Sequence, residues 1–135
     1  MMNAFSPCLP SEKAKLLSPL QLAFVGDSVH ALLARTRLMQ VERRMNDMHK
    51  LSTRQVNAVS QHQALEKLLP HLTADEMDIV RRGRNAHSKH GIPKSATVED
   101  YSAATALEAL YGYLYMSGQM ARLKEIDDIC YQEDM

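Results

Sequence analysis

The chain is poor in the residues that break helices and in those that cross-link small secreted folds. Its 135 residues include five glycines, five prolines, two cysteines and no tryptophan. Leu, Ala and Met are abundant instead, and this composition favours an all-α fold. Cys8 and Cys130 lie near opposite ends and do not make a disulfide framework, which indicates a reducing, cytoplasmic location.

Long hydrophobic runs are also missing. No stretch reaches the roughly 18 uninterrupted apolar residues of a membrane-spanning helix. The start of the chain, MMNAFSPCLPSEKAK, lacks the long apolar core of a secretory signal. We therefore expect a cytoplasmic protein that does not insert into a membrane. The length suits one domain built around one hydrophobic core.

Helix caps and breakers divide the chain into a short arm and one helical domain. Residues 1–15 are expected to form an N-terminal arm, and residues 16–135 the domain. Residues 84–96 carry Gly, Pro, Ser and Asn and are expected to be an exposed loop. The predicted helices run from Pro19, capped by Ser18, to about Met39; from the cap Asn46 to Pro70, with a break near Ser60; from Thr73 to Gly83; from Thr97 to Ser117; and from about Met120 to Ile129.

Two carboxylates stand alone in apolar helical segments. Asp27 is the only acid between Leu16 and Val41, and Glu108 is the only charged residue between Tyr101 and Met116. Both helices are expected to bury most of their surface, where a lone ionised acid is costly unless it is paired or binds a cation. Acids from neighbouring helices can hold Mg²⁺ or Mn²⁺. The alternatives are that each acid pairs with a distant basic residue, or that both lie at the surface.

The net charge of zero hides a segregation of charge. Residues 79–98 contain no acid, whereas the end of the chain, KEIDDICYQEDM, is acidic. This segregation indicates a basic face for a polyanion, although two ordinary solvated faces are an open alternative. The basic residues of this stretch are Arg81, Arg82, Arg84, Lys89 and Lys94, and a second basic group consists of Arg35, Arg37, Arg43 and Arg44.

Three histidines could be mistaken for metal ligands. His87 and His90 lie three residues apart with no acid or cysteine near them, so RNA contact or solvent exposure is the better interpretation. His30 follows Asp27 by one helical turn and is expected to be a packed or hydrogen-bonded histidine.

Two motifs resemble the ribonuclease III family. Residues 22–29, LAFVGDSV, resemble the family motif Leu-Glu-Phe-Leu-Gly-Asp-Ala-Val, and residues 107–112, LEALYG, resemble Phe-Glu-Ala-Leu-Ile-Gly. Residues 46–49 (NDMH), 53–54 (TR) and 81–86 (RRGRNA) are similar to the Mini-ribonuclease III branch, which has no double-stranded-RNA-binding domain. Ala23 and Thr105 stand where the full-length enzymes have further acids, which leaves Asp27 and Glu108.

The resemblance implies a function and an assembly. It implies an all-helical homodimer, with Phe24 at the dimer interface, that cuts double-stranded RNA with Mg²⁺, or with Mn²⁺ as a substitute. Asp27 and Glu108 would be the catalytic and metal-binding residues, and the products would carry 5′-phosphate and 3′-hydroxyl ends. The candidate RNA-binding residues are Arg81, Arg82, Arg84, Asn85, Lys89 and Lys94. The implied substrate is the precursor of large-subunit (23S) ribosomal RNA, and a ribosomal protein stays open as an accessory partner. The rival interpretation is a non-catalytic helical RNA-binding or ribosome-assembly factor.

Overall fold

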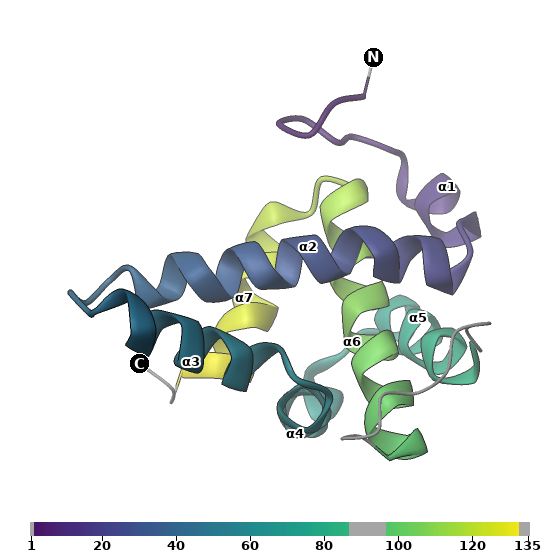
Figure 1. The fold of residues 1–135 in the computed structure, drawn as a ribbon. Coiled ribbons are helices and arrows are strands. Elements are labelled where there is room, and N and C mark those ends of the chain that lie inside the picture. The colour runs from purple at the N-terminus through teal and green to yellow at the C-terminus, as the bar shows by residue number, and fades with distance from the viewer. Residues whose placement is uncertain (1, 87–96, 133–135) are drawn as a thin grey trace.

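The computed structural model describes residues 2–86 and 97–132, and these residues form seven α-helices (Figure 1). Apart from one isolated bridge between Asn3 and Ser6, the described part contains no β-structure, so the predicted all-α class is confirmed. None of its helices is long and apolar enough to cross a membrane. The elements are α1 (Ser11–Leu16), α2 (Pro19–Leu38), α3 (Met45–Val56), α4 (Ala58–Leu68), the 3₁₀ turn η1 (Leu69–His71), α5 (Ala74–Asn85), α6 (Val98–Met116) and α7 (Met120–Tyr131).

Side-chain caps start three of the helices where the sequence predicts them. Ser18 and Gln21 form a reciprocal capping box at the start of α2, with distances of 3.1 Å for both hydrogen bonds. Thr73 and Glu76 form the same arrangement at the start of α5. Thr97 caps α6 by accepting from the backbone N–H of Asp100. Each cap satisfies a backbone donor that the first helical turn leaves unpaired.

Other predicted boundaries are wrong by a few residues. Asn46 is the second residue of α3 and not its cap, because Arg44 occupies the N-cap position. The break between α3 and α4 lies at Asn57, three residues before Ser60, and the Asn57 side chain accepts from the Ser60 backbone N–H. The final helix continues to Tyr131, two residues beyond the predicted end.

Gly83 does not end α5, which continues to Asn85. A Cβ atom added to Gly83 would lie 2.7 Å from the Cα atom of Ala106 in α6. The missing side chain therefore lets α5 pack directly against the backbone of α6, and the glycine serves close approach and not helix termination.

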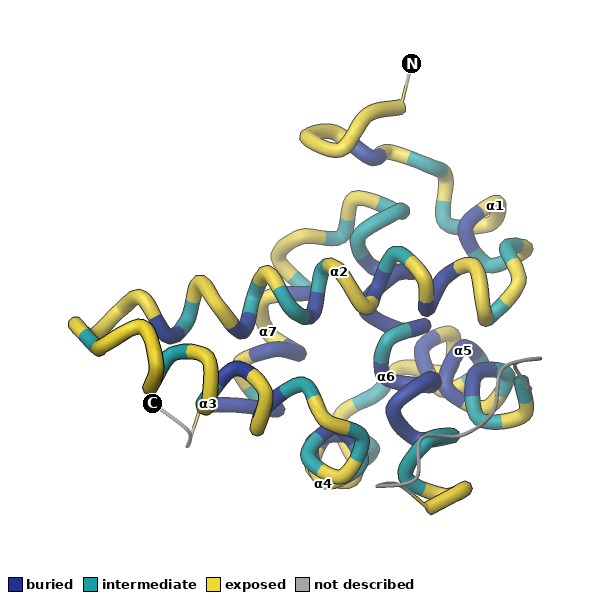
Figure 2. The backbone as a smooth tube through the Cα atoms, viewed as in Figure 1, coloured by how far each residue is buried: buried dark blue, intermediate teal, exposed yellow. Residues whose placement is uncertain are grey.

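Helix α6 is the centre of the fold. Every residue from Ala103 to Leu114 is buried except Glu108, and Figure 2 shows this buried stretch crossing behind α2. Helices α2, α4 and α5 pack around α6, with α2 making the most extensive contact. Fully buried Leu65, Leu107, Leu110 and Ile126 belong to the core between these helices.

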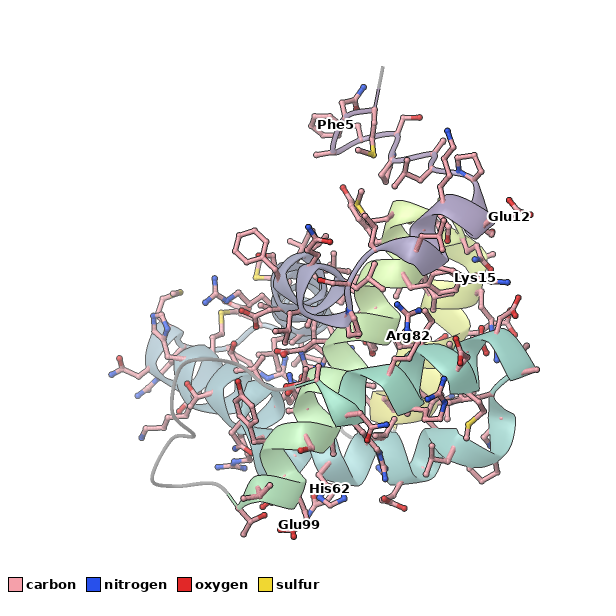
Figure 3. The ribbon with its side chains drawn as sticks, turned by 90° about the vertical axis from the view of Figure 1, so that its right-hand side faces the viewer. Phe5, Glu12, Lys15, His62, Arg82 and Glu99 are labelled. Atoms are coloured by element: carbon pink, nitrogen blue, oxygen red, sulfur yellow. The ribbon has the colours of Figure 1, made fainter. Side chains whose placement is uncertain are left out.

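The segment that joins α1 to α2 is held by α5. Arg82 of α5 donates to the carbonyl oxygen of Lys15 at 2.7 Å and to that of Leu17 at 3.0 Å. In Figure 3 the labelled Arg82 and Lys15 lie close together, whereas Phe5 lies far from the helices. Ala14 is buried, so the predicted arm of residues 1–15 includes part of a helix that packs on the core.

Candidate active site

The two isolated acids meet where α2 crosses α6, and two glycines bring these helices together. A Cβ atom on Gly26 would lie 1.6 Å from the backbone oxygen of Glu108, and one on Gly112 would lie 1.9 Å from the backbone oxygen of Leu22. No side chain fits in such gaps, so the two backbones touch. Gly26 precedes Asp27 directly, and Gly112 follows Glu108 by one turn. The crossing therefore places both carboxyl groups at one point, where they form a side-chain hydrogen bond.

The exposure of the two acids differs from the expectation. Asp27 is exposed, whereas Glu108 is partly buried. The expectation that α2 buries most of its surface is wrong, because its outer face leaves Leu20, Phe24 and Leu32 exposed. The site is thus open to solvent on the α2 side and enclosed by protein on the α6 side.

The acidity of Glu108 reflects this enclosure. The pKa of Glu108 is raised to about 8, mainly by burial and further by the neighbouring Asp27 carboxyl through charge repulsion and their hydrogen bond. The amide of Gln61 acts in the opposite direction by donating to Oε2 of Glu108 at 3.4 Å. No Lys or Arg of residues 2–86 and 97–132 is among the groups that shift this pKa, so no distant basic partner in these residues compensates Glu108.

The carboxyl pair is a small ligand set for a cation. Among the described residues, no cluster of three or more His, Cys, Asp or Glu side chains could hold a metal ion. The position of Ala23 is buried, and the hydroxyl of Thr105 donates to the carbonyl oxygen of Tyr101 within α6. Two carboxylates suit Mg²⁺, which keeps several waters and accepts substrate phosphate oxygens as further ligands.

His30 is a packed histidine, as the sequence predicts. It is 1% exposed, and its Nε2 lies 2.5 Å from the hydroxyl oxygen of Tyr131. Burial, with a smaller contribution from the nearby Arg37 charge, lowers the pKa of His30 to about 4, so its ring is neutral at pH 7. His30 therefore belongs to the buried side of the site and not to its ligands.

The described members of the predicted RNA-binding set contact different parts of the protein. Arg81 is exposed and pairs with Asp78 at 2.6 Å, and Arg84 lies 3.5 Å from Glu66. Arg82 contacts the carbonyl oxygens of Lys15 and Leu17 as described above. Asn85 ends α5 and is exposed. Lys89, Lys94, His87 and His90 lie outside the described residues.

Sequence reasoning missed Gln61. This residue is on α4 and is 1% exposed, yet its amide reaches both Glu108 and His30. A glutamine in an amphipathic helix gives no sign of whether its amide faces solvent or a carboxylate on another helix. The one available signal is its position in the α4 pattern, three residues before the buried Ala64.

Comparison with known proteins identifies the class. The ribonuclease III domain model matches residues 20–119. A crystal structure of a protein from Fusobacterium nucleatum superposes with a TM-score of 0.80 at 30% identity, covering 89% of this chain and 96% of that one. The chain therefore belongs to the ribonuclease III family and is an endoribonuclease by class.

Its relatives locate it more narrowly within that family. A Mini-ribonuclease 3 from Symbiobacterium thermophilum is 48% identical over 111 residues, which cover 82% of this chain and 85% of the relative. A second, from Thermoanaerobacter sp., is 42% identical over 125 residues, covering 92% and 87%. The resemblance to the Mini-ribonuclease III branch is confirmed. Enzymes of this family act on RNA and depend on divalent metal ions.

Proposed function

We propose that this protein is an Mg²⁺-dependent endoribonuclease specific for double-stranded RNA, with Asp27 and Glu108 as its catalytic, metal-binding residues. Mn²⁺ would substitute for Mg²⁺. The substrate we propose is the cytoplasmic precursor of 23S ribosomal RNA, which the resemblance of the sequence motifs to the Mini-ribonuclease III branch implies. The rival, a non-catalytic RNA-binding or assembly factor, has no use for two carboxyl groups held against each other.

The observation that carries this proposal is the uncompensated carboxyl pair. Burial and repulsion from Asp27 together raise the pKa of Glu108, and no basic side chain among the described residues relieves that repulsion. A divalent cation between them would remove it, so the residues fit such an ion. When bound, Mg²⁺ supplies activation of water, orientation of the phosphodiester and stabilisation of the charge developing on it.

Asp27 and Glu108 have different roles in this arrangement. The partly buried Glu108 gives the site a fixed, low-dielectric side, where a charge–charge interaction is stronger than in water. The exposed Asp27 lies on the open side, where an RNA phosphate can approach. Both must be ionised to hold a cation, so proton loss from Glu108 accompanies metal binding.

The RNA contact is proposed for the basic residues at the end of α5 and beyond it. A protein reads double-stranded RNA mainly by its shape, backbone and 2′-hydroxyl groups, which suits a scatter of cationic and amide side chains. Arg82 is left out of this surface because its guanidinium group already binds two carbonyl oxygens. The proposed contacts are Arg81, Arg84, Asn85, Lys89 and Lys94.

A homodimer is proposed on the outer face of α2. Phe24 is 81% exposed there, although it is one turn from the active-site acid. Leu20 and Leu32 on the same helix are 40% and 65% exposed. A second copy of the chain would cover this apolar face. A ribosomal protein is the further partner proposed, because ribosomal RNA precursors carry such proteins.

The test is cleavage of RNA by purified protein. Long double-stranded RNA and each of its single strands would be incubated with Mg²⁺ or with a chelator. We expect shortening of the duplex alone, only with Mg²⁺, and 5′-phosphate and 3′-hydroxyl ends on the products. Binding of the duplex without any metal-dependent cleavage would support the assembly factor and overturn the proposal.

A further inference from the structure

Gln61 joins the active-site carboxyl group to a buried hydrogen-bond network. Its Nε2 lies 3.4 Å from Oε2 of Glu108 and 3.5 Å from Nδ1 of His30. Helix α4, which carries it, packs against α6, and the side chain is 1% exposed. An amide nitrogen has two hydrogens, so one can point to each acceptor. Gln61 therefore bridges three helices, α4, α6 and α2.

The placement of the Gln61 amide nitrogen defines the roles of donor and acceptor along this network. The amide nitrogen of Gln61 only donates, so Nδ1 of His30 must accept and carry no proton. In the neutral ring the proton then resides on Nε2, which donates to the hydroxyl oxygen of Tyr131 at 2.5 Å. The Gln61 amide nitrogen thus fixes the tautomer of His30, and the Tyr131 hydroxyl on α7, which can accept or donate, is compatible with it.

This orientation matters because the opposite one would be unfavourable. If the Gln61 amide were reversed, its carbonyl oxygen would face the ionised Glu108 carboxylate, and this contact would be repulsive. The reversed amide would also require the proton of His30 to move to Nδ1, with the Tyr131 hydroxyl donating to Nε2. A buried donor with two acceptors in place is therefore a rigid support for an ionised carboxylate.

We infer that Gln61 is a positioning residue for Glu108, and that His30 acts on the active site through Gln61. This inference rests on the proposed metal-binding role of Glu108 and Asp27. Hydrogen bonds from outside the ligand set hold a metal-binding carboxylate in its productive orientation, and their loss typically costs about 10–100-fold in metal affinity or activity. Gln61 thus supports a site that has only two protein ligands and little else to fix their direction.

A second buried glutamine provides a matched control. Gln55 on α3 is 7% exposed and accepts from Nη2 of Arg37 at 2.8 Å. Arg37 in turn pairs with Asp127 at 2.5 Å, and Asp127 accepts from the hydroxyl of Tyr111 at 2.7 Å. This second cluster meets the first at the rings of Tyr111 and Tyr131, which pack against His30. Gln55 itself hydrogen-bonds Arg37 and not the active-site carboxyl group, so Gln55→Leu is the control for loss of a buried glutamine that does not contact Glu108.

The experiment measures Mn²⁺ binding to metal-free protein by electron paramagnetic resonance, together with kcat and KM for RNA cleavage. The variants are Gln61→Leu, His30→Phe, their double variant, Gln55→Leu and Asp27→Asn. We expect Gln61→Leu to weaken Mn²⁺ binding roughly tenfold and to lower kcat, with KM for RNA unchanged. Gln55→Leu should lower stability to urea and leave Mn²⁺ affinity as in the wild type. His30→Phe as a single variant should weaken Mn²⁺ binding. Combined with Gln61→Leu, it should cause no further loss of Mn²⁺ affinity.

The outcomes separate this inference from the proposed function. Mn²⁺ binding by Asp27→Asn at wild-type affinity would refute the metal site itself. If Asp27→Asn loses binding while Gln61→Leu keeps it, the metal site stands and the positioning role is wrong. An equal loss of Mn²⁺ affinity in Gln61→Leu and Gln55→Leu would also overturn the positioning role, because a general loss of packing would then explain both results. If Gln61→Leu does not fold, Gln61→Asn, whose shorter amide cannot reach both acceptors, makes the same comparison.

Discussion

At the scale of single residues, the site depends on a contrast between two acids of the same charge. Asp27 and Glu108 are both isolated in the sequence, and this isolation was enough to single them out. The sequence does not show that Asp27 is exposed and Glu108 is enclosed, because that depends on which face of α2 the rest of the fold leaves open. Nor does it show Gln61, whose partner lies 47 residues away along the chain.

Neutralising either acid should stop the reaction without unfolding the protein. Asp27→Asn and Glu108→Gln keep the shape of each side chain and remove the charge that holds the cation. Because a lost electrostatic contact in the transition state typically costs ~10²–10³ in rate, we expect single-turnover cleavage of double-stranded RNA to fall at least that far. Glu125→Gln, at an exposed acid on α7, is the control and should cleave normally. Full activity in either active-site variant would contradict the mechanism.

Stability of the metal-free protein should depend on the titration of Glu108. Its pKa is about 8 in the folded protein and near 4.5 when unfolded, so the folded state holds the extra proton between these values. Stability must therefore fall as pH rises through this range. His30 has the opposite effect, because its pKa is about 4 in the folded protein and 6.5 when unfolded. Its contribution to stability therefore rises as pH rises from about 4 to 6.5.

Comparison with Glu108→Gln isolates this effect, because His30 contributes equally to both proteins. We expect the free energy of unfolding of the wild type, relative to Glu108→Gln, to fall by roughly 2–4 kcal/mol from pH 5 to pH 8. Urea titrations in chelator at several pH values measure it. Saturating Mg²⁺ should remove the decline, because a cation favours the ionised carboxylate. A difference that does not change with pH would show that Glu108 titrates normally.

At the scale of helices, local signals predicted the starts better than the ends. Ser18, Thr73 and Thr97 cap helices through contacts within one turn, which the sequence alone specifies. Gly83 is a residue type that commonly ends a helix, but here it allows α5 to pack closely against Ala106 of α6. Gly26 and Gly112 likewise serve a helix crossing that local patterns do not show.

The adjacent residues Arg81 and Arg82 should have opposite roles. Arg82→Ala removes two charge-assisted hydrogen bonds to the segment between α1 and α2, so it should lower the free energy of unfolding by roughly 2 kcal/mol. Arg81→Ala removes only an exposed pair with Asp78 and should change stability by less than about 0.5 kcal/mol. Arg81→Ala should instead reduce the salt dependence of RNA binding. Equal stability of the two variants would refute the structural role of Arg82.

At the scale of the whole molecule, we expect a second copy of the chain to cover the exposed apolar face of α2. Phe24→Ala should shift the protein toward the monomer and lower cleavage at dilute concentration, because the removed ring is 81% exposed in the single chain. Met77→Ala, at a partly exposed methionine on α5, is the control and should not change the mass. Light scattering at micromolar concentration reports the mass, and a wild-type monomer under these conditions would argue against the dimer.

We expect one divalent cation to bind between Asp27 and Glu108, and anomalous diffraction from crystals soaked in Mn²⁺ would locate it. Wild-type crystals should show a peak within coordination distance of a carboxylate oxygen from each residue, and Glu108→Gln crystals should show no peak there. A peak bound by other side chains, with the two carboxyl groups still hydrogen-bonded to each other at saturating Mn²⁺, would contradict this expectation.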